Sequence, residues 1–106
     1  MALLENASAG TLFSLMETRP LLTVLFVDES DLCKKYLSMP WVAEEAEVLV
    51  VDEGMADIFQ VGKVPQYRFF LEGSEISNLV GTCNRDTVLE FKQKIFGNVR
   101  TLKPRG

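Results

Sequence analysis

The sequence predicts an α/β domain in which helices cover both faces of a mixed β-sheet. Two apolar runs, residues 21–27 and 47–52, have the composition of strands that are buried on both faces, and a helical segment follows each. Two later strand segments, 66–71 and 75–80, are separated by a short turn, which predicts an antiparallel hairpin. We therefore expect a sheet of four strands, or five if residues 2–4 add a short leading strand, with a parallel β-α-β half and a C-terminal hairpin.

The first half of the chain has clear start and stop signals. Ser8 is a suitable N-cap for a helix over residues 8–18, and Pro20 prevents that helix from continuing. After the strand 21–27, a second helix begins at Asp28 or Ser30, and Pro40 should end or bend it before residues 41–46 continue in helical form. The core face of the first helix is predicted to consist of Leu12, Leu15 and Met16.

The second half continues this alternation. After the strand 47–52, residues 55–61 are predicted to form a short helix, and Glu72-Gly73 should form the hairpin turn. Asn84 is a good N-cap for the last helix, which Gly97 should end. The apolar faces of these two helices are predicted to be Met55, Ile58 and Phe59 in the first, and Val88, Phe91 and Ile95 in the second.

The composition suits one globular domain. The chain has 106 residues, of which 47% are apolar and 25% charged, enough for one core and too few for two. We expect the domain to span residues 1–97. Residues 98–106 are expected to form a C-terminal tail or linker, because they combine three basic residues with Pro104 and Gly106.

Charge and missing residue types exclude several functions. A net charge of −4 repels phosphate backbones, so nucleic acid is not an expected partner. No apolar run approaches the roughly 20 residues of a membrane span, and the N-terminus lacks the features of a signal peptide, so we expect a cytoplasmic or other intracellular protein without a membrane partner. With no histidine and only two cysteines, neither a metal site nor a resident cofactor is expected.

The segment Ser30-Asp31-Leu32-Cys33 directly follows the first apolar strand and is the most informative motif of the chain. It corresponds to a C-x-x-C redox pair whose first sulfur has become oxygen. A C-x-x-C pair at a strand-to-helix junction makes and breaks a disulfide, because its two thiols can close a small ring. With Ser30 in the first place that ring cannot form, so two-electron dithiol chemistry is not expected.

The order of elements and several local segments resemble the thioredoxin family over nearly the whole chain. The best match is the stretch 64–75, in which Val64-Pro65 precedes a strand, a glycine-containing turn and a second strand, and Val80-Gly81 matches the strand end that approaches the active site. The resemblance implies the thioredoxin fold and a cis Pro65 that faces residues 30–33. It also implies that this loop holds an incoming peptide by backbone hydrogen bonds. The alternative is an ordinary trans proline at a strand start.

The departures from the family concern its catalytic groups. Glu29 to Cys33 replace the aromatic-Cys-Gly-Pro-Cys signature, and Val24 stands where many thioredoxins bury a proton-handling aspartate. Pro40 lies two positions later than the family's helix proline, so Cys33 could also align one place before the second cysteine. The electrophilic disulfide, the attacking thiol and the buried acid are therefore all expected to be missing.

Each candidate site residue also has a purely structural interpretation. Cys33 could be a thiolate favoured by the helix N-terminus and neighbouring lysines, but three nearby acidic residues oppose this, and the sulfur could simply be buried under Pro65. Ser30 could be only a helix N-cap, and without a histidine it has no base that would make it a nucleophile. Cys83, 50 positions after Cys33, could resolve a mixed disulfide or fill space as a small apolar residue. Trp41 and Tyr36 could line a peptide groove or instead pack under the bent helix, and Gly81 is a candidate binding residue from its place at the strand end near the site.

The leading hypothesis is a thioredoxin-like protein that lacks the first active-site cysteine. It would serve as a binding or regulatory module of thiol-redox pathways, or as a one-cysteine (monothiol) redox protein. The monothiol mechanism would join Cys33 to glutathione or to a protein as a mixed disulfide, which an external thiol would then release. Dithiol reductase activity is disfavoured, and the sequence leaves open whether the protein is an enzyme.

Two other interpretations remain. The chain resembles, more loosely, the degenerate non-catalytic domains that precede glutaredoxin domains in multidomain monothiol glutaredoxins, so it could be one domain of a larger assembly. Ser30 could also be an engineered replacement that traps a substrate, which the divergence at Val24, Asp31 and Leu32 opposes. The expected partner is a protein or peptide, with glutathione as a candidate thiol partner, and an exposed groove beside Trp41 and Pro65 would also suit a dimer.

Overall fold

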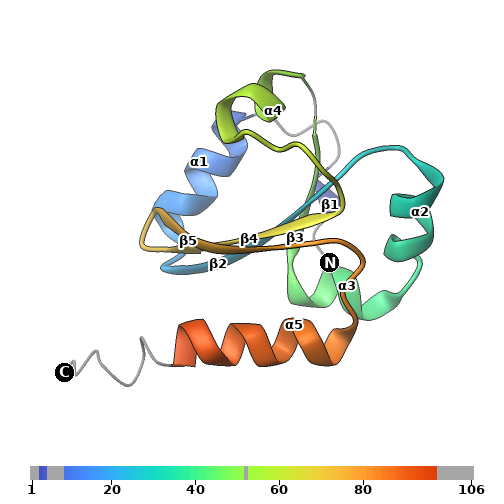
Figure 1. Ribbon diagram of the computed structural model, residues 1–106. Coiled ribbons are helices and arrows are strands. Elements are labelled where there is room, and N and C mark those ends of the chain that lie inside the picture. The colour runs from blue at the N-terminus through green and yellow to red at the C-terminus, as the bar shows by residue number, and fades with distance from the viewer. Residues whose placement is uncertain (1–2, 5–8, 52, 98–106) are drawn as a thin grey trace.

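A computed structural model describes residues 3–4, 9–51 and 53–97, which form an α/β sandwich around one mixed sheet (Figure 1). The strand order is β1-β3-β2-β4-β5, with β1, β3 and β2 parallel and β4 and β5 antiparallel to their neighbours. The strands are β1 (Leu3–Leu4), β2 (Leu21–Val27), β3 (Glu47–Val50), β4 (Gln66–Leu71) and β5 (Ser74–Val80). The expected parallel half, short leading strand and C-terminal hairpin are therefore confirmed.

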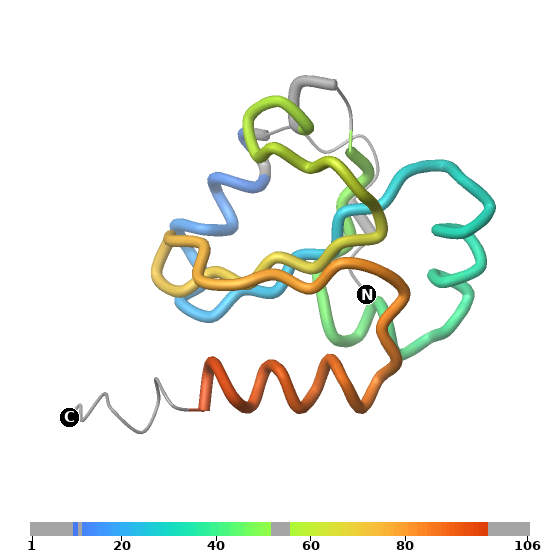
Figure 2. The backbone as a smooth tube through the Cα atoms, in the orientation of Figure 1, coloured from blue at the N-terminus to red at the C-terminus, as the bar shows by residue number. Residues whose placement is uncertain are grey.

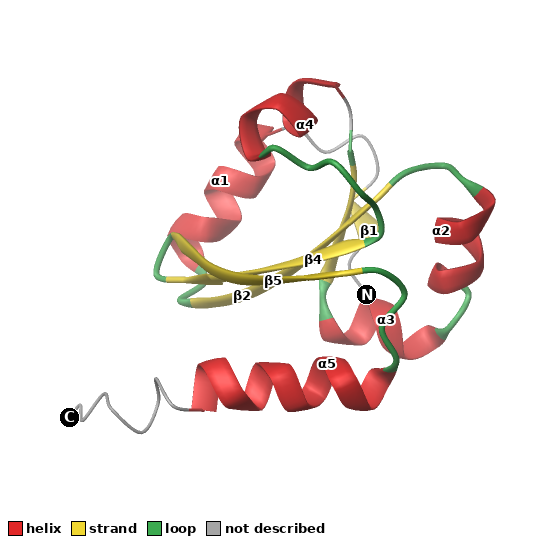
Figure 3. Cartoon of the chain, viewed as in Figure 1, coloured by secondary structure: helices red, strands yellow, loops and turns green. Residues whose placement is uncertain are grey.

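Helices lie on both sides of the sheet, as Figures 1 and 3 show. Helices α1 (Ala9–Thr18) and α4 (Glu53–Phe59) cover one face. The other face carries α2 (Asp31–Leu37), α3 (Pro40–Glu45) and α5 (Arg85–Lys92), and a π-helical turn, η1 (Gln93–Gly97), extends α5. In the backbone trace of Figure 2, α5 runs along the sheet and begins close to α3.

Strand β2 occupies the centre of the sheet because its side chains are apolar on both faces. Leu25 and Val27 belong to the core cluster that includes α2, α3 and α5, whereas Leu22, Val24 and Phe26 belong to the cluster under α1 and α4. All five side chains are fully buried. The continuous apolar run thus correctly indicated a central strand covered on both sides.

Local signals placed the turns and helix breaks. Glu72 and Gly73 have φ angles of 49° and 88°, the left-handed pair that closes a two-residue hairpin in accord with the twist of its strands. Pro40 is the first residue of α3, and Met39 before it is extended, so α2 and α3 are separate helices.

Two predicted elements differ from the structure. Strand β3 ends at Val50 rather than at residue 52. Helix α4 spans Glu53–Phe59 rather than 55–61, and it ends at Phe59 because Gln60 takes a left-handed conformation with φ of 54°. Ile58, predicted to share one apolar face with Phe59, has a side chain that is 56% exposed. Phe59 is the residue that turns inward, toward the rings of Phe13 and Phe26. Ser8 and the tail 98–106 lie outside the described residues.

Candidate functional site

The loop between β2 and α2 is organised by short-range hydrogen bonds. Ser30 is the N-cap of α2, and its hydroxyl oxygen accepts a hydrogen bond of 3.3 Å from the backbone N–H of Cys33. The carboxylate of Asp28 accepts one of 2.9 Å from the Ser30 N–H. Hydrogen bonds from the side chain and backbone of Ser30 lower the pKa of Asp28. Ser30 therefore performs the capping role that its residue type predicted.

Cys33 lies in the core and not on the surface. Its side chain has no exposed area and belongs to the cluster that joins α2, α3 and α5 to the sheet. Burial raises the pKa of the Cys33 thiol above its ordinary value, because a thiolate would lose its hydration. The sequence left the direction of this shift open. In the folded chain, desolvation outweighs the hydrogen bonds with Asp28 and Ser30 that act in the opposite direction.

The Val64–Pro65 loop lies beside this end of the sheet. The peptide bond between the two residues is cis. Gln66, the next residue, pairs with Phe26 of β2, which places Pro65 next to the carboxyl end of that strand. The N–H of Gly81, whose φ is 108°, donates a hydrogen bond of 2.9 Å to the Pro65 carbonyl. The fold thus brings Pro65 and Gly81, which are far apart in the sequence, into contact at this end of the sheet.

A hydrogen-bonded pair of tyrosines holds the loop before α5 in place, and the sequence did not predict this pair. The Tyr36 hydroxyl donates a hydrogen bond of 2.6 Å to the Cys83 carbonyl and lies 2.6 Å from the Tyr67 hydroxyl. Since Tyr36 has one hydroxyl proton, Tyr67 donates to Tyr36. Burial raises the pKa of both phenols, so both keep their protons. The available signal was a tyrosine in a buried strand, whose hydroxyl needs a partner.

A groove opens between α2, the joint to α3 and the loop before α5, with a volume of about 490 Å³. We call it the Trp41 groove. The half-buried Trp41 meets Tyr36 edge to face, with ring centroids 5.9 Å apart. The groove is lined by Leu32, Lys35, Tyr36, Ser38, Met39, Trp41, Thr82, Cys83, Asn84 and Arg85.

The structure therefore separates the two cysteines. Cys83 is half-buried and lines the Trp41 groove, whereas Cys33 lies in the core. Both are free thiols, and burial raises the pKa of Cys83 as well. Of the other predicted residues, Trp41 lines the groove, and Val64 packs against the clusters on both faces. Leu32, Met39 and the two cations of the groove were not predicted, because only the fold brings α2 and the loop before α5 together.

The described residues also bear on metal binding and on membrane insertion. In residues 3–4, 9–51 and 53–97 no three His, Cys, Asp or Glu side chains gather in a way that could hold a metal ion. Within the same ranges no helix is long and apolar enough to cross a membrane.

The arrangement defines a class of protein: an α/β domain with a cis-proline loop and a helix N-terminus at the carboxyl end of its central strand. Several solved thioredoxin structures have a similar fold. A mutant thioredoxin from Halobacterium salinarum is 17% identical, with a TM-score of 0.69 over 88% of this chain and 89% of its own. Spinach chloroplast thioredoxin f is 16% identical, with a TM-score of 0.70 over 88% and 92%. Fasciola hepatica thioredoxin is 23% identical, with a TM-score of 0.63 over 89% and 98%.

The chain thus has the thioredoxin fold, as its sequence predicted. No protein-family model and no curated protein matches it. At these identities the similarity shows the fold alone.

Proposed function

We propose that this protein is a divergent member of the thioredoxin family that binds a protein or peptide and does not perform dithiol chemistry. The observation that carries the proposal is the environment of Cys33, whose side chain has no exposed area and whose pKa is raised by burial. Ser30 occupies the first position of the motif with an oxygen that is engaged in capping α2. A thiol that is buried and protonated is a poor nucleophile.

The binding surface in this proposal is the end of the sheet formed by the Val64–Pro65 loop, Gly81 and the Trp41 groove. The backbone N–H and C=O of Val64 make no hydrogen bond within the described residues, so they are available to an extended peptide. Leu32 and Met39 at the groove are 55% and 36% exposed, and apolar area of this kind gains free energy when a partner covers it. The same role suits a domain of a larger assembly whose chemistry belongs to another domain.

A second candidate is a one-cysteine redox protein, which the half-buried Cys83 in the Trp41 groove favours. Its thiolate would attack oxidised glutathione, forming a protein–glutathione disulfide and releasing one reduced glutathione. The raised pKa of Cys83 opposes this step, because only the thiolate attacks.

The first experiment measures the chemistry. The Cys83→Ser protein is exposed to oxidised glutathione, and its intact mass is recorded when folded and in urea. We expect no adduct on the folded protein and one adduct on Cys33 in urea. An adduct on folded Cys33 would instead establish the monothiol protein. The matched Cys33→Ser protein reports on Cys83 in the same way.

The second experiment measures binding without assuming a sequence preference. Peptides are selected from an unbiased displayed library and mapped by chemical-shift changes of the backbone amides. We expect the changes to concentrate at the Val64–Pro65 loop, Gly81 and the Trp41 groove. If no selected peptide contacts this end of the sheet, the binding proposal is wrong.

A further inference from the structure

The Trp41 groove combines an apolar floor with two cations, and this combination indicates the chemistry of its occupant. We propose that the groove binds a peptide segment that places a large apolar side chain against Trp41 and carboxylates beside Lys35 and Arg85. The inference rests on the proposed function and specifies its partner.

The charge of the groove differs from that of the whole chain. Its lining contains Lys35 and Arg85 and no acidic residue, although the chain carries a net charge of −4. Both side chains are exposed, and neither is within ion-pair distance of a carboxylate in the described residues. The neighbouring acids, Asp31 one turn earlier on α2 and Asp86 next along α5, do not line the groove. The two cations are therefore available to a partner.

The apolar part of the groove is shaped for a side chain. Trp41 is held edge to face against Tyr36, whose hydroxyl is tied to the Cys83 carbonyl. This fixes the aromatic wall before any partner arrives, so little conformational entropy is lost there on binding. Leu32 and Met39 are exposed at the same groove, and the unbranched side chain of methionine adapts readily to the shape of an apolar group.

The same features favour a peptide over other occupants. A small anion would use the two cations and leave the apolar lining in water, which forgoes the main gain of free energy. A nucleic acid would meet the acidic remainder of the surface, which repels its phosphates. An acidic segment with an apolar centre satisfies both the cations and the aromatic wall.

The test uses three synthetic decapeptides that share a Leu-Phe centre and differ only in their flanks, which are Glu, Gln or Lys. Trp41 is the only tryptophan of the chain, so its fluorescence reports directly on the groove. We expect the Glu peptide to bind about ten-fold more tightly than the Gln peptide, because two exposed ion pairs each add a modest amount. The Lys peptide should bind most weakly. The difference between the peptides should largely disappear in 0.5 M NaCl, because the Debye length falls from about 10 Å at 0.1 M salt to about 3 Å at 1 M and exposed ion pairs are then screened.

Matched variants assign the effect to the two cations. The Lys35→Glu/Arg85→Glu protein should reverse the order of the three peptides. The Lys34→Glu/Lys94→Glu protein carries the same change of charge on the exposed neighbour in α2 and on the turn after α5, outside the groove lining. It should keep the original order. Circular dichroism verifies that both variants are folded.

The outcomes separate this inference from the proposed function. If the Gln peptide binds as tightly as the Glu peptide, or if both variants respond alike, the acidic partner is wrong while binding at this end of the sheet stands. The acidic-peptide proposal is also wrong if ATP or a second copy of the chain occupies the groove and displaces the peptides. The proposed function itself is contradicted by two other results, which are the absence of any library peptide at this end of the sheet and an adduct on folded Cys33.

Discussion

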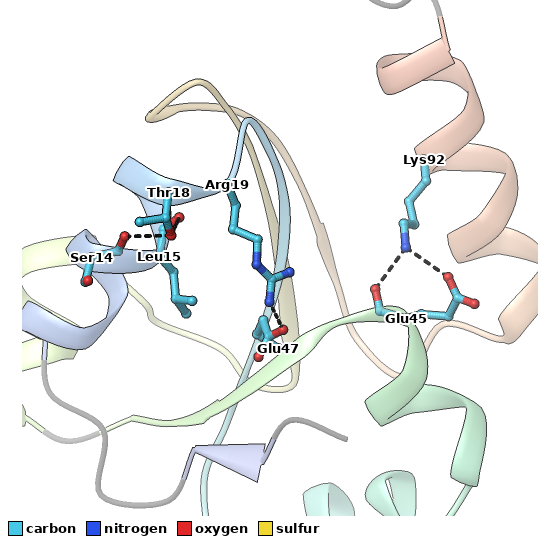
Figure 4. A network of polar contacts seen from close by, with 7 residues as sticks. All are labelled: Ser14, Leu15, Thr18, Arg19, Glu45, Glu47 and Lys92. Atoms are coloured by element: carbon cyan, nitrogen blue, oxygen red, sulfur yellow. Dashed lines mark hydrogen bonds and ion pairs between the residues drawn. The ribbon is translucent and has the colours of Figure 1, made fainter.

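Two of the surface grooves formed by the described residues lie at opposite ends of the central strand, and their charged side chains play different roles. The Trp41 groove lies at the carboxyl end of β2 and leaves Lys35 and Arg85 without an ion pair in the described residues. At the other end a cleft of about 440 Å³ is lined by the start of β2, the end of α3 and the end of α5. We call it the α3–α5 cleft. Its cations, Arg19 and Lys92, are both paired (Figure 4).

The pairs in the α3–α5 cleft join elements that are distant in the sequence. Lys92 of α5 contacts both the carboxylate and the carbonyl oxygen of Glu45, each at 2.9 Å, and so ties α5 to the end of α3. Arg19, before β2, pairs with Glu47 at the start of β3. A cation at the C-terminus of a helix is also favoured by the helix dipole. In this cleft the charged side chains join distant elements of the fold, whereas in the Trp41 groove neutral hydrogen bonds do so and the two cations make no ion pair with a described residue.

The largest effect is expected from Tyr36→Phe, at the groove. The change leaves the Cys83 carbonyl and the Tyr67 hydroxyl without their partner, which costs about 1–3 kcal/mol of unfolding free energy. Urea denaturation measures it. Tyr67→Phe is the control and should cost less, because Tyr36 can still donate to Cys83. A loss below about 0.5 kcal/mol for Tyr36→Phe would show that the loop is held by packing instead.

The next effect is expected at the cap of α2. Ser30→Ala removes the acceptor for the Cys33 N–H and should lower the unfolding free energy by about 1 kcal/mol, while Ser30→Asp should retain most of it. Thermal and urea unfolding report the difference. Equal stability of the Ala and Asp variants would mean that the hydroxyl contributes no cap.

In the α3–α5 cleft, Lys92→Met should cost roughly 0.5–1 kcal/mol, since the ion pair with Glu45 is partly exposed. The loss should shrink in 1 M NaCl, where charges are screened. The Tyr36→Phe loss should not change with salt, because it involves neutral groups. If salt changes the stability loss of both variants equally, the contrast between neutral hydrogen bonds at the Trp41 groove and ion pairs in the α3–α5 cleft is wrong.

A smaller effect concerns Asp28, whose pKa is lowered in the folded chain by hydrogen bonds from Ser30. A lowered folded-state pKa contributes stability above the unfolded value of 3.8, and this contribution is lost as the pH falls through the folded value. Stability between pH 5 and pH 2 should therefore fall less steeply in Asp28→Asn. An identical slope in both proteins would contradict the assignment.

The smallest effect is expected for the cations of the Trp41 groove. Lys35→Met and Arg85→Met should each change the unfolding free energy by less than about 0.5 kcal/mol, as surface substitutions without partners do. These are the residues whose loss should weaken an acidic peptide. A large stability loss here would mean that the charges are structural, as in the α3–α5 cleft.

Much of the fold follows from signals that act over a few residues. The apolar run of β2, the break at Pro40, the caps at Ser30 and Asn84 and the Glu72-Gly73 turn were all predicted and are all present. Each depends on backbone hydrogen bonding or on side-chain periodicity within about one turn of helix or one strand. The exposure of Ile58 was not predictable in this way, since it depends on how α4 rotates against the sheet.

The sequence by itself determined the order of elements, the N-cap at Ser30 and the absence of a C-x-x-C pair. Only the tertiary structure decided that Cys33 is a buried thiol with a raised pKa and that Lys35 and Arg85 share one groove. The hydroxyl of Tyr36 meets partners 31 and 47 positions away. Burial, desolvation and charge pairing arise from such distant contacts, and the local pattern of residues does not contain them.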